Sequence, residues 1–304
     1  MRIDVIIATH NRAALLLRAI ESLLPEAGAD ATIVVVDNAS TDETPRLVRR
    51  LEAETGGRVR YLREGRLGKS RAVNRAIAGT TGEVLAFADD DQAMAPGWLD
   101  AIRGAMAAGF DYVTGPVLAD WEAPPPRWYD ERLRGVLSLF DGGGAPAPLE
   151  PGDARDVFSG GNAAVTRAAI DRIGGLHPAL GKIAGTFSTC EDGELLLRLK
   201  RAGLRGLYDP RMLVRHRVPP ERLTRTYFRR WHVGYGRSMA LLDALHPKPV
   251  AYWAGLPRFL LRAGLEAVPR MLLAAARGDR AGAFQQELQL WFMCGFLDRK
   301  WKKG

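Results

Sequence analysis

Three consecutive carboxylates, Asp89, Asp90 and Asp91, follow an apolar run, Val84–Ala88, that has the length of a buried strand. Adjacent acids repel one another and cost stability unless a cation compensates. Hard oxygen ligands suit Mg²⁺ or Mn²⁺, which commonly bridge a protein carboxylate to substrate phosphates. The triplet is therefore a candidate metal site. The alternative is a solvated acidic turn that stabilises the N-terminus of the next helix.

Polar side chains also follow the first two predicted strands, Ile3–Ala8 and Thr32–Val36. An acid at a strand end can accept hydrogen bonds from a base or a ribose, as it does in dinucleotide-binding folds. No G-x-G-x-x-G follows the first strand, which argues against an NAD or FAD site. Ser40 or Thr41 is expected to cap the next helix. The candidate residues are Thr9, Asn11 and Arg12 after the first strand, and Asp37 and Asn38 after the second.

Strand-length apolar runs and helix-like stretches alternate from Ile3 to Thr114. Near-continuous apolar strands that alternate with helices predict an α/β fold, with a Rossmann-like, mainly parallel sheet flanked by helices. In such sheets ligands bind at the carboxyl ends of the strands, where Asp37 and Asp89 both stand. The sequence therefore predicts a small-molecule site at that edge.

Regular patterning stops between Asp120 and Asp153, a stretch rich in proline and glycine that we expect to be a long surface excursion. A helix is predicted over Glu191–Ala202, and the chain after Pro220 is predicted to be mostly helical. We expect a catalytic domain over residues 1–218, with a nucleotide-binding half at about 1–115 and an acceptor half at about 116–218. A helical C-terminal appendage is expected over residues 219–304.

Six short motifs, in this order, resemble those of the family-2 glycosyltransferases, which have the nucleotide-sugar-binding GT-A fold. The resemblance spans roughly Ile3 to Arg237, with Ala8 and His10 standing where the family carries a proline and an aromatic residue. The motifs are Ala8-Thr9-His10-Asn11-Arg12, similar to P-T-Y-N-R; Val36-Asp37-Asn38-Ala39-Ser40-Thr41-Asp42, similar to V-D-x-S-x-D; Gly68-Lys69-Ser70-Arg71-Ala72-Val73-Asn74, similar to G-x-x-x-A-x-N; Asp89-Asp90-Asp91, similar to D-x-D; Ser159-Gly160-Gly161-Asn162, similar to the G-G-N-like element; and Glu191-Asp192, similar to E-D.

The resemblance implies a role for each matching residue. Asp192 would be the catalytic base, which removes the proton of the acceptor hydroxyl as that oxygen attacks the anomeric carbon. A divalent metal, Mn²⁺ or Mg²⁺, would be held by Asp91 with Asp89 and His216, and would neutralise the leaving diphosphate. The donor nucleotide would contact Thr9, Asn11, Arg12, Asp37, Asn38, Arg71, Asp89 and Asp90; the sugar or the acceptor would contact Gly160, Gly161, Asn162, Glu191 and Trp231; and Arg229 and Arg230 would pair with the pyrophosphate.

Plainer alternatives exist for several of these residues. Glu191 and Asp192 could merely place negative charge on the first turn of a helix, His216 could be structural, and Trp231 could belong to the core. The resemblance further implies an inverting transfer from a nucleotide-sugar, a UDP-sugar, to a glycan or lipid-linked acceptor. Processive synthases of the family carry Q-x-x-R-W, of which the segment 227–231 keeps only the Arg-Trp end. The pattern therefore indicates transfer of a single sugar.

Composition adds a basic balance: 43 Lys and Arg against 35 Asp and Glu give a formal charge of +8, which favours anionic partners. One rival function is a sugar nucleotidyltransferase, which should carry a glycine-rich basic loop where His10-Asn11-Arg12 stands. The other is a basic nucleic-acid-binding or scaffold protein, which would not need the acidic triplet. We expect no nucleic-acid partner. With two cysteines, no leader-like start and no long apolar run, a cytoplasmic protein, peripheral on the inner face of the cell membrane, is expected.

The segment Leu256–Arg277 is amphipathic. Charged residues, mostly arginine, recur every four positions, and at about 100° per residue they fill one arc of roughly 120°. This pattern predicts a helix that lies on an anionic membrane surface, where its cations meet the headgroups. The alternative is a helix packed on the catalytic domain or on a second subunit in a homodimer. Pro269 is expected to kink or divide the helix.

Overall fold

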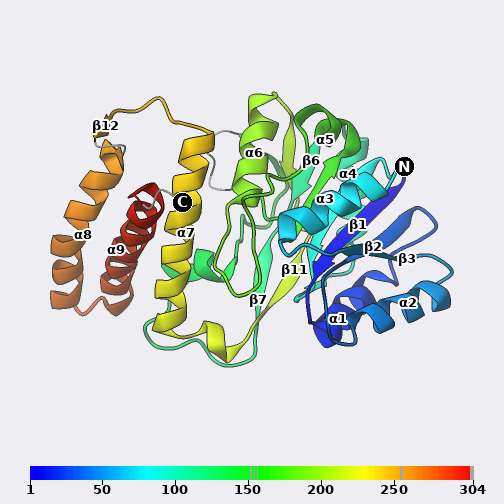
Figure 1. The fold of residues 1–304 in the computed structure, drawn as a ribbon, viewed down its shortest axis with the longest axis horizontal. Coiled ribbons are helices and arrows are strands. Elements are labelled where there is room, and N and C mark those ends of the chain that lie inside the picture. Colours follow the sequence, from blue (N-terminus) through cyan, green and yellow to red (C-terminus); the bar gives the residue numbers. More distant parts are fainter. Residues whose placement is uncertain (151–152, 154, 156, 254–255, 302–304) are drawn as a thin grey trace. The chain divides into compact units, whose positions relative to one another are not determined.

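The computed structural model describes residues 1–150, 153, 155, 157–253 and 256–301, and the chain forms two compact units (Figure 1). Unit 1 comprises Met1–Asp120, Leu139–Ala184 and Glu191–Arg217. Unit 2 comprises Trp121–Ser138, Gly185–Cys190 and Val218–Gly304. The segments 121–138 and 185–190 therefore cluster with the C-terminal helices, although the sequence alone places them in the catalytic domain.

An eight-stranded sheet forms the centre of unit 1, in the order β3-β2-β1-β4-β9-β6-β10-β8. Strands β1 to β4 run parallel, β9 is antiparallel to both β4 and β6, and β10 is again parallel to β6. The expectation of a mainly parallel sheet is confirmed. The strands are β1 (Ile3–Thr9), β2 (Ala31–Asn38), β3 (Val59–Glu64), β4 (Val84–Asp89), β6 (Tyr112–Thr114), β8 (Ala147–Pro148), β9 (Asn162–Thr166) and β10 (Gly206–Tyr208).

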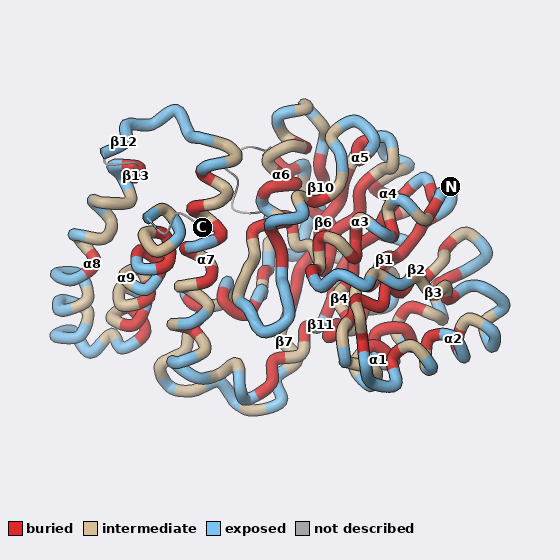
Figure 2. The backbone as a smooth tube through the Cα atoms, viewed as in Figure 1, coloured by how far each residue is buried: buried red, intermediate tan, exposed pale blue. Residues whose placement is uncertain are grey.

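Helices cover both faces of this sheet, so its central strands are buried on both sides (Figure 2). Val5 and Ile7 pack toward one face, whereas Ile6, one residue out of phase, packs toward the other. Burial on both faces explains why the strands are continuous apolar runs rather than alternating ones. The first face carries α1 (Ala13–Leu23), α2 (Thr44–Glu54) and α4 (Trp98–Ala107); the second carries α3 (Lys69–Gly79), α5 (Arg167–Ile173) and α6 (Glu191–Arg201).

A second, three-stranded sheet has the order β5-β11-β7. Its strands are β5 (Gln92–Met94), β11 (Val214–Val218) and β7 (Val117–Trp121). β5 begins directly after the acidic triplet, and the antiparallel register pairs His216 with Gln92. This sheet therefore brings the late strand β11 to the triplet. Among its described residues, the stretch expected to be irregular holds the end of β7, the 3-10 helix η1 (Glu131–Leu137) and β8.

The expected cap of α2 is wrong. Glu43 is the N-cap residue and its side chain makes no capping hydrogen bond, whereas the Asp42 carboxylate accepts a hydrogen bond from the Thr44 backbone N–H at 3.0 Å. The Ser40 hydroxyl instead accepts a hydrogen bond from the Asn11 backbone N–H at 3.0 Å, and the Thr41 backbone N–H donates to the Asn11 side chain at 2.7 Å. Ser40 and Thr41 thus join the loop after β2 to the loop after β1. The spacing of residues in the sequence does not reveal this contact.

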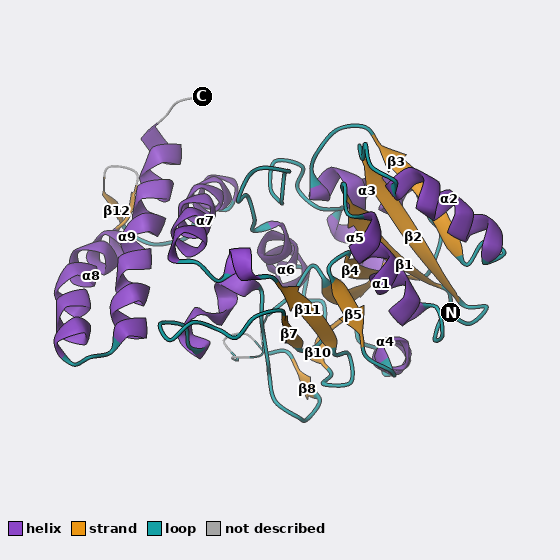
Figure 3. Cartoon of the chain, turned by 90° about the horizontal axis from the view of Figure 1, so that it is seen from below, coloured by secondary structure: helices purple, strands orange, loops and turns teal. Residues whose placement is uncertain are grey.

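Unit 2 consists mainly of three long helices: α7 (Arg225–Leu245), α8 (Arg258–Ala276) and α9 (Arg280–Trp301). They lie side by side, with α9 packed against both α7 and α8 (Figures 1 and 3). A short hairpin of β12 (Tyr252–Trp253) and β13 (Leu256–Pro257) precedes α8, and the 3-10 helix η2 (Pro220–Arg222) precedes α7. The predicted helical C-terminal region is confirmed. Within the described part of the chain, no helix combines the length and the apolar character needed to cross a bilayer.

Helix α8 continues through Pro269, so of the two expected effects, a kink or a division, the helix is not divided. A proline removes one helical hydrogen bond and leaves the carbonyl four residues earlier without its donor. Leu265 and Pro269 are both exposed, so this carbonyl lies on the side of the helix that water reaches.

Candidate active site

The residues singled out by the sequence meet at one edge of the large sheet. Parallel register places Thr9 opposite Asp37, and Ala8 opposite Asp89, at the carboxyl ends of β1, β2 and β4. The antiparallel strand β9 begins at this same edge, because Asn162 lies opposite Ala88. Segments from distant parts of unit 1 thus converge where an open α/β sheet places its ligands.

Asp90 is the most enclosed member of the acidic triplet. Its carboxylate accepts hydrogen bonds from the Thr9 hydroxyl at 2.8 Å and from the Arg12 guanidinium at 2.8 Å. Burial raises the pKa of Asp90, and the charge of Arg12 opposes this shift. Arg12 also reaches Asp91 at 3.2 Å. Thr9, Arg12 and Asp90 therefore form a buried support beneath the other two acids.

Asp91 lies beside His216, with 3.4 Å between Asp91 Oδ1 and His216 Nε2, and both side chains are buried. The backbone N–H of Arg217 donates to the Asp91 carbonyl at 3.0 Å, which holds β11 against the triplet. Among the described residues, no three His, Cys, Asp or Glu side chains are grouped closely enough to hold a metal ion by themselves. Asp91 and His216 therefore offer one carboxylate and one imidazole. These ligands suit Mn²⁺ when substrate oxygens complete the coordination.

Lys69, which the sequence analysis did not assign to the site, links Asp89 to α6. Its Nζ donates to Asp89 Oδ1 at 2.5 Å. Burial disfavours the charged ammonium, but the charges of Asp89 and then Asp192 outweigh it and raise the pKa of Lys69. Its position directly after Gly68, at the start of α3, was the only sequence signal for this role.

Glu191 and Asp192 open α6 with two carboxylates that are not fully satisfied. Asp192 Oδ2 accepts a hydrogen bond from the Gly160 backbone N–H at 2.9 Å. Asp192 Oδ1 and Glu191 Oε2 are buried and have no hydrogen-bond partner elsewhere among the described residues, although the neighbouring carboxyl groups of Asp192 and Glu191 interact with each other. Burial raises the pKa of Glu191 to about 8, helped by the neighbouring charge of Asp192, and burial also raises the pKa of Asp192. Such a pair is equipped to exchange protons with a bound molecule.

Gly160 and Gly161 are required by close packing at the start of β9. A Cβ at Gly160 would collide with the Asp192 carboxylate, and one at Gly161 would collide with the Asp89 carboxylate. Asn162 is fully buried, and its side-chain amide donates to the carbonyls of Pro116 and Met212. Gly160 and Gly161 thus let two acids approach the chain, whereas the Asn162 side chain is used to hold strands together.

On the donor side, Asp37 is fully buried and both its oxygens have partners within the fold. They accept hydrogen bonds from the Ser40 backbone N–H and from the Tyr61 hydroxyl, each at 2.8 Å. Asn38 accepts from the Gly68 backbone N–H at 2.8 Å and so fixes the loop before α3. The structure therefore uses Asp37 and Asn38 to shape this edge.

Asn11 has φ of 52°, a left-handed conformation that asparagine tolerates better than most residues. Its side chain joins the loops after β1 and β2, as the Thr41 contact shows. Arg71 lies in the first turns of α3 and is half-buried, with its side chain near Gly68. Asn11 thus contributes geometry, and Arg71 contributes a cation close to the loop that Asn38 fixes.

The remaining predicted site residues belong to α7, in unit 2. Arg229 pairs with Glu287, with 2.6 Å between Nε and Oε1. The Arg230 guanidinium lies 5.4 Å from the centre of the Phe187 ring, and Trp231 stacks on Tyr235 with 5.0 Å between ring centres. Each of these three side chains has a partner inside unit 2.

Comparisons with known proteins give a consistent picture. The model of a family described as glycosyl transferase family 2 matches residues 4–174. The succinoglycan biosynthesis protein ExoM of Rhizobium meliloti is 26% identical over 253 residues, which cover 81% of this chain and 77% of ExoM. A GalNAc(5)-diNAcBac-PP-undecaprenol beta-1,3-glucosyltransferase of Campylobacter jejuni is 29% identical over 123 residues, 40% of each chain. The chain spans from 32% to 79% of the lengths of four such relatives.

Among solved structures, the chain is similar to the mannosyltransferase PcManGT of Pyrobaculum calidifontis, solved in complex with GDP-Man and Mn²⁺. The TM-score is 0.64 at 21% identity, and the superposition covers 100% of this chain and 88% of that one. At this level of identity the likeness concerns the fold. It covers the whole length of the chain, so it extends to the helices of unit 2 as well as to the sheet.

Proposed function

Because the chain belongs to glycosyl transferase family 2, we propose that it transfers a single sugar from a UDP-sugar to a glycan or lipid-linked acceptor, with inversion at the anomeric carbon. The GT-A fold and the glycosyltransferase class expected from the motifs are both confirmed. The rival interpretations as a nucleotidyltransferase or as a nucleic-acid-binding scaffold are therefore set aside. The UDP-sugar donor, the glycan or lipid-linked acceptor and the inversion at the anomeric carbon are what we propose beyond the fold and the class.

The observation that carries this proposal is the unsatisfied carboxylate oxygen of Asp192 at the ligand-binding edge of the sheet. Gly160 holds one oxygen of Asp192, which leaves Oδ1 to accept the proton of an acceptor hydroxyl as that hydroxyl attacks the anomeric carbon. A single displacement assisted by one base inverts the anomeric centre. Glu191, whose raised pKa keeps it protonated near neutral pH, supports the pair by adding no second negative charge.

In our proposal Asp91 and His216 would hold a divalent ion, with Asp89 assisting from its pair with Lys69. The donor set fits, since it combines a carboxylate and an imidazole in a buried place, and PcManGT was solved with Mn²⁺. When bound, such an ion neutralises the diphosphate leaving group. Thr9 and Arg12 keep the triplet in place through Asp90, and in our proposal Arg71 would contact the nucleotide.

The acceptor class rests on what the relatives' names state. ExoM is named for succinoglycan biosynthesis, and the Campylobacter relative acts on an undecaprenol-linked saccharide. Gly160 and Glu191 adjoin Asp192, and we propose that they contact the acceptor together with Gly161. Because Arg229 is paired with Glu287, we propose that it stabilises unit 2.

A thermal-shift screen tests the proposal. Nucleoside diphosphates and nucleotide sugars are added with and without Mn²⁺ or Mg²⁺, and a ligand that binds only the folded state raises the melting temperature. We expect UDP or a UDP-sugar to stabilise the protein only when the metal is present. Stabilisation by GDP alone would change the donor class, and no nucleotide effect with either metal would contradict the proposal.

A further inference from the structure

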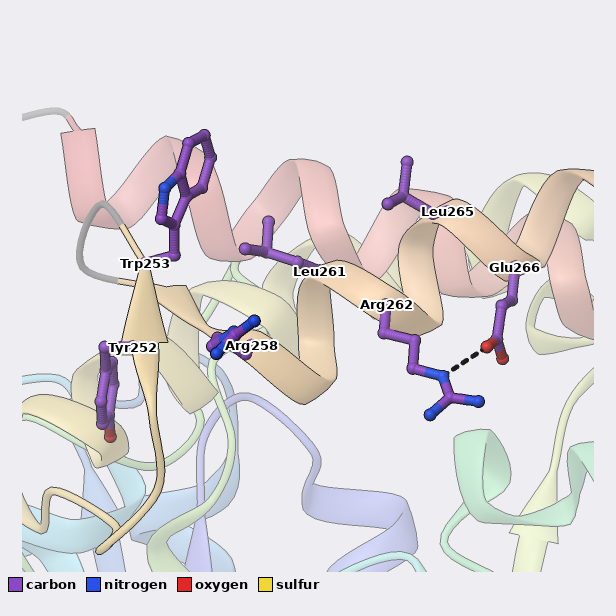
Figure 4. Close-up of a pocket in the computed structure, with 7 residues that line it drawn as sticks. All are labelled: Tyr252, Trp253, Arg258, Leu261, Arg262, Leu265 and Glu266. Atoms are coloured by element: carbon purple, nitrogen blue, oxygen red, sulfur yellow. Dashed lines mark hydrogen bonds and ion pairs between the residues drawn. The ribbon is translucent and has the colours of Figure 1, made fainter.

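Unit 2 carries an exposed apolar surface that the proposed reaction does not use. It lies on α8 and on the β12–β13 hairpin that precedes this helix (Figure 4). Leu265 is 79% exposed, Trp253 68% and Leu272 61%. Side chains of this size are individually costly to keep in water, and a group of them on one element marks an interaction site.

Two strips run along the surface of helix α8: an apolar strip and, beside it, a charged strip. Leu265, Val268 and Leu272 are exposed and recur at intervals of three and four residues, which places them on one side of the helix. Arg262 and Glu266 lie on the adjacent side. Figure 4 shows this division, with Leu265 pointing away from Arg262 and Glu266. The helix thus presents an apolar strip and a charged strip together.

Cations outnumber acids along this segment. Glu266 accepts from Arg262 Nε at 2.6 Å and from an Arg270 guanidinium nitrogen at 2.5 Å, so its single charge is shared between two arginines. Lys248 lies over the exposed Phe259 ring, 5.4 Å from its centre. From residue 246 to 278 the charged residues are Lys248, Arg258, Arg262, Glu266, Arg270 and Arg277. The surface therefore has a net positive charge beside its apolar strip.

Strand β12, which carries Trp253, is tied to α7 through Tyr252. The Tyr252 hydroxyl donates to Asp243 Oδ1 at 2.7 Å, and Lys300 Nζ lies 3.0 Å from Asp243 Oδ2. Between this hairpin and α8 lies an open groove of about 580 Å³. Its walls combine aromatic, aliphatic and cationic groups: Tyr252, Trp253, Arg258, Leu261, Arg262, Leu265 and Glu266.

We propose that this surface docks on a phospholipid bilayer that contains anionic lipids. The arginines of α8 bind the lipid phosphates, while Trp253, Leu265 and Leu272 enter the boundary between headgroups and acyl chains. Charge complementarity favours this occupant over a second copy of the chain, which would bring the same excess of arginine to the contact. The docking is independent of which sugar is transferred, and it would hold the enzyme where a lipid-linked acceptor resides.

Flotation of the full chain with vesicles tests the docking surface. We expect it to float with vesicles of phosphatidylcholine and phosphatidylglycerol, less so at high salt, and not with phosphatidylcholine alone. The variant Leu265→Glu with Leu272→Glu should lower partition at least about tenfold, because two exposed apolar groups become charged. The variant Arg262→Gln with Arg270→Gln should lower it about fivefold for each arginine lost.

The matched control is Arg46→Gln with Arg50→Gln. Both arginines lie exposed on α2 and pair with a glutamate three or four residues away, as Arg262 and Arg270 do. This control should float like the parent chain. An equal loss in the control would mean that only net charge matters and would overturn the proposal, as would unchanged flotation of the Leu265→Glu, Leu272→Glu variant.

Light scattering after size-exclusion chromatography tests the alternative occupant, a second copy of the chain. A dimer that dissociates in the Leu265→Glu, Leu272→Glu variant, with no flotation of the parent chain, would assign the surface to a second copy. The same variant should keep the metal-dependent thermal shift with nucleotide in the absence of vesicles. The experiments can therefore contradict membrane docking without contradicting the proposed sugar transfer, and the reverse.

Discussion

Glu191→Gln should stabilise the protein increasingly as the pH rises. Burial raises the pKa of Glu191 to about 8 from an ordinary 4.5, so its protonated form is the one that the fold favours. The stability that it contributes is complete below about pH 4.5 and is lost as the pH rises through 8. Between pH 6 and pH 9 this loss amounts to about 2–3 kcal/mol. Glutamine resembles the protonated acid in shape and cannot ionise, so the variant avoids the loss.

The assay is thermal melting of both proteins at pH 6 and pH 9, without nucleotide or metal. The melting temperature of the variant relative to the parent should rise by about 3–5 °C between these two pH values. The matched control is Glu194→Gln, one turn later on α6. Glu194 is equally buried, but it pairs with Arg198 at 2.7 Å, so its substitution should destabilise the protein at both pH values.

A pH-independent difference between Glu191→Gln and the parent chain would refute this reasoning. It would mean that Glu191 is ionised in the folded protein throughout this range and that Lys69 compensates it fully. The carboxylate pair would then carry two negative charges, and the view of Asp192 as the single base beside a neutral acid would have to be abandoned.

Three further predictions concern the site. Asp91→Asn should keep the melting temperature of the free protein within a few degrees but lose metal-dependent nucleotide binding in calorimetry, and unchanged binding would remove Asp91 from the metal site. Gly160→Ala should lower transfer about 100-fold with donor binding retained, because the added methyl group displaces the Asp192 carboxylate; normal turnover would contradict the assigned geometry. Since burial raises the pKa of Asp192 and the base must be ionised, kcat/KM should fall on acidification with a midpoint above 3.8, and a midpoint at or below this value would point to another base.

Much of unit 1 follows from local patterns. β1 and β4 each extend the predicted strand, Ile3–Ala8 and Val84–Ala88, by one residue. These strands are predictable because burial on both faces demands continuous apolar runs. β5 is not predictable in this way, since three residues after an acidic turn carry no pattern and the strand exists only because β11 pairs with it.

The members of the candidate site were predictable from the sequence where a side chain lies at a strand end or a helix start, as with Asp89 and Asp192. It was less so where partners come from elsewhere in the chain. Lys69 reaches Asp89 from α3, and Tyr61 reaches Asp37 from β3. The assignment of Trp121–Ser138 to unit 2 likewise depends on long-range packing that no local pattern encodes.

The central claim is that Asp192 removes the acceptor proton, and Asp192→Asn tests it most directly. Asparagine keeps the size of the side chain and can still accept the Gly160 hydrogen bond, but it cannot take up a proton. With metal and nucleotide-sugar supplied, donor binding measured by calorimetry should stay within about threefold of the parent chain, since the donor side does not use this carboxylate. Sugar transfer to the acceptor under single-turnover conditions should fall by about 100-fold or more. Near-normal transfer by the variant would contradict the account and move the base to another residue.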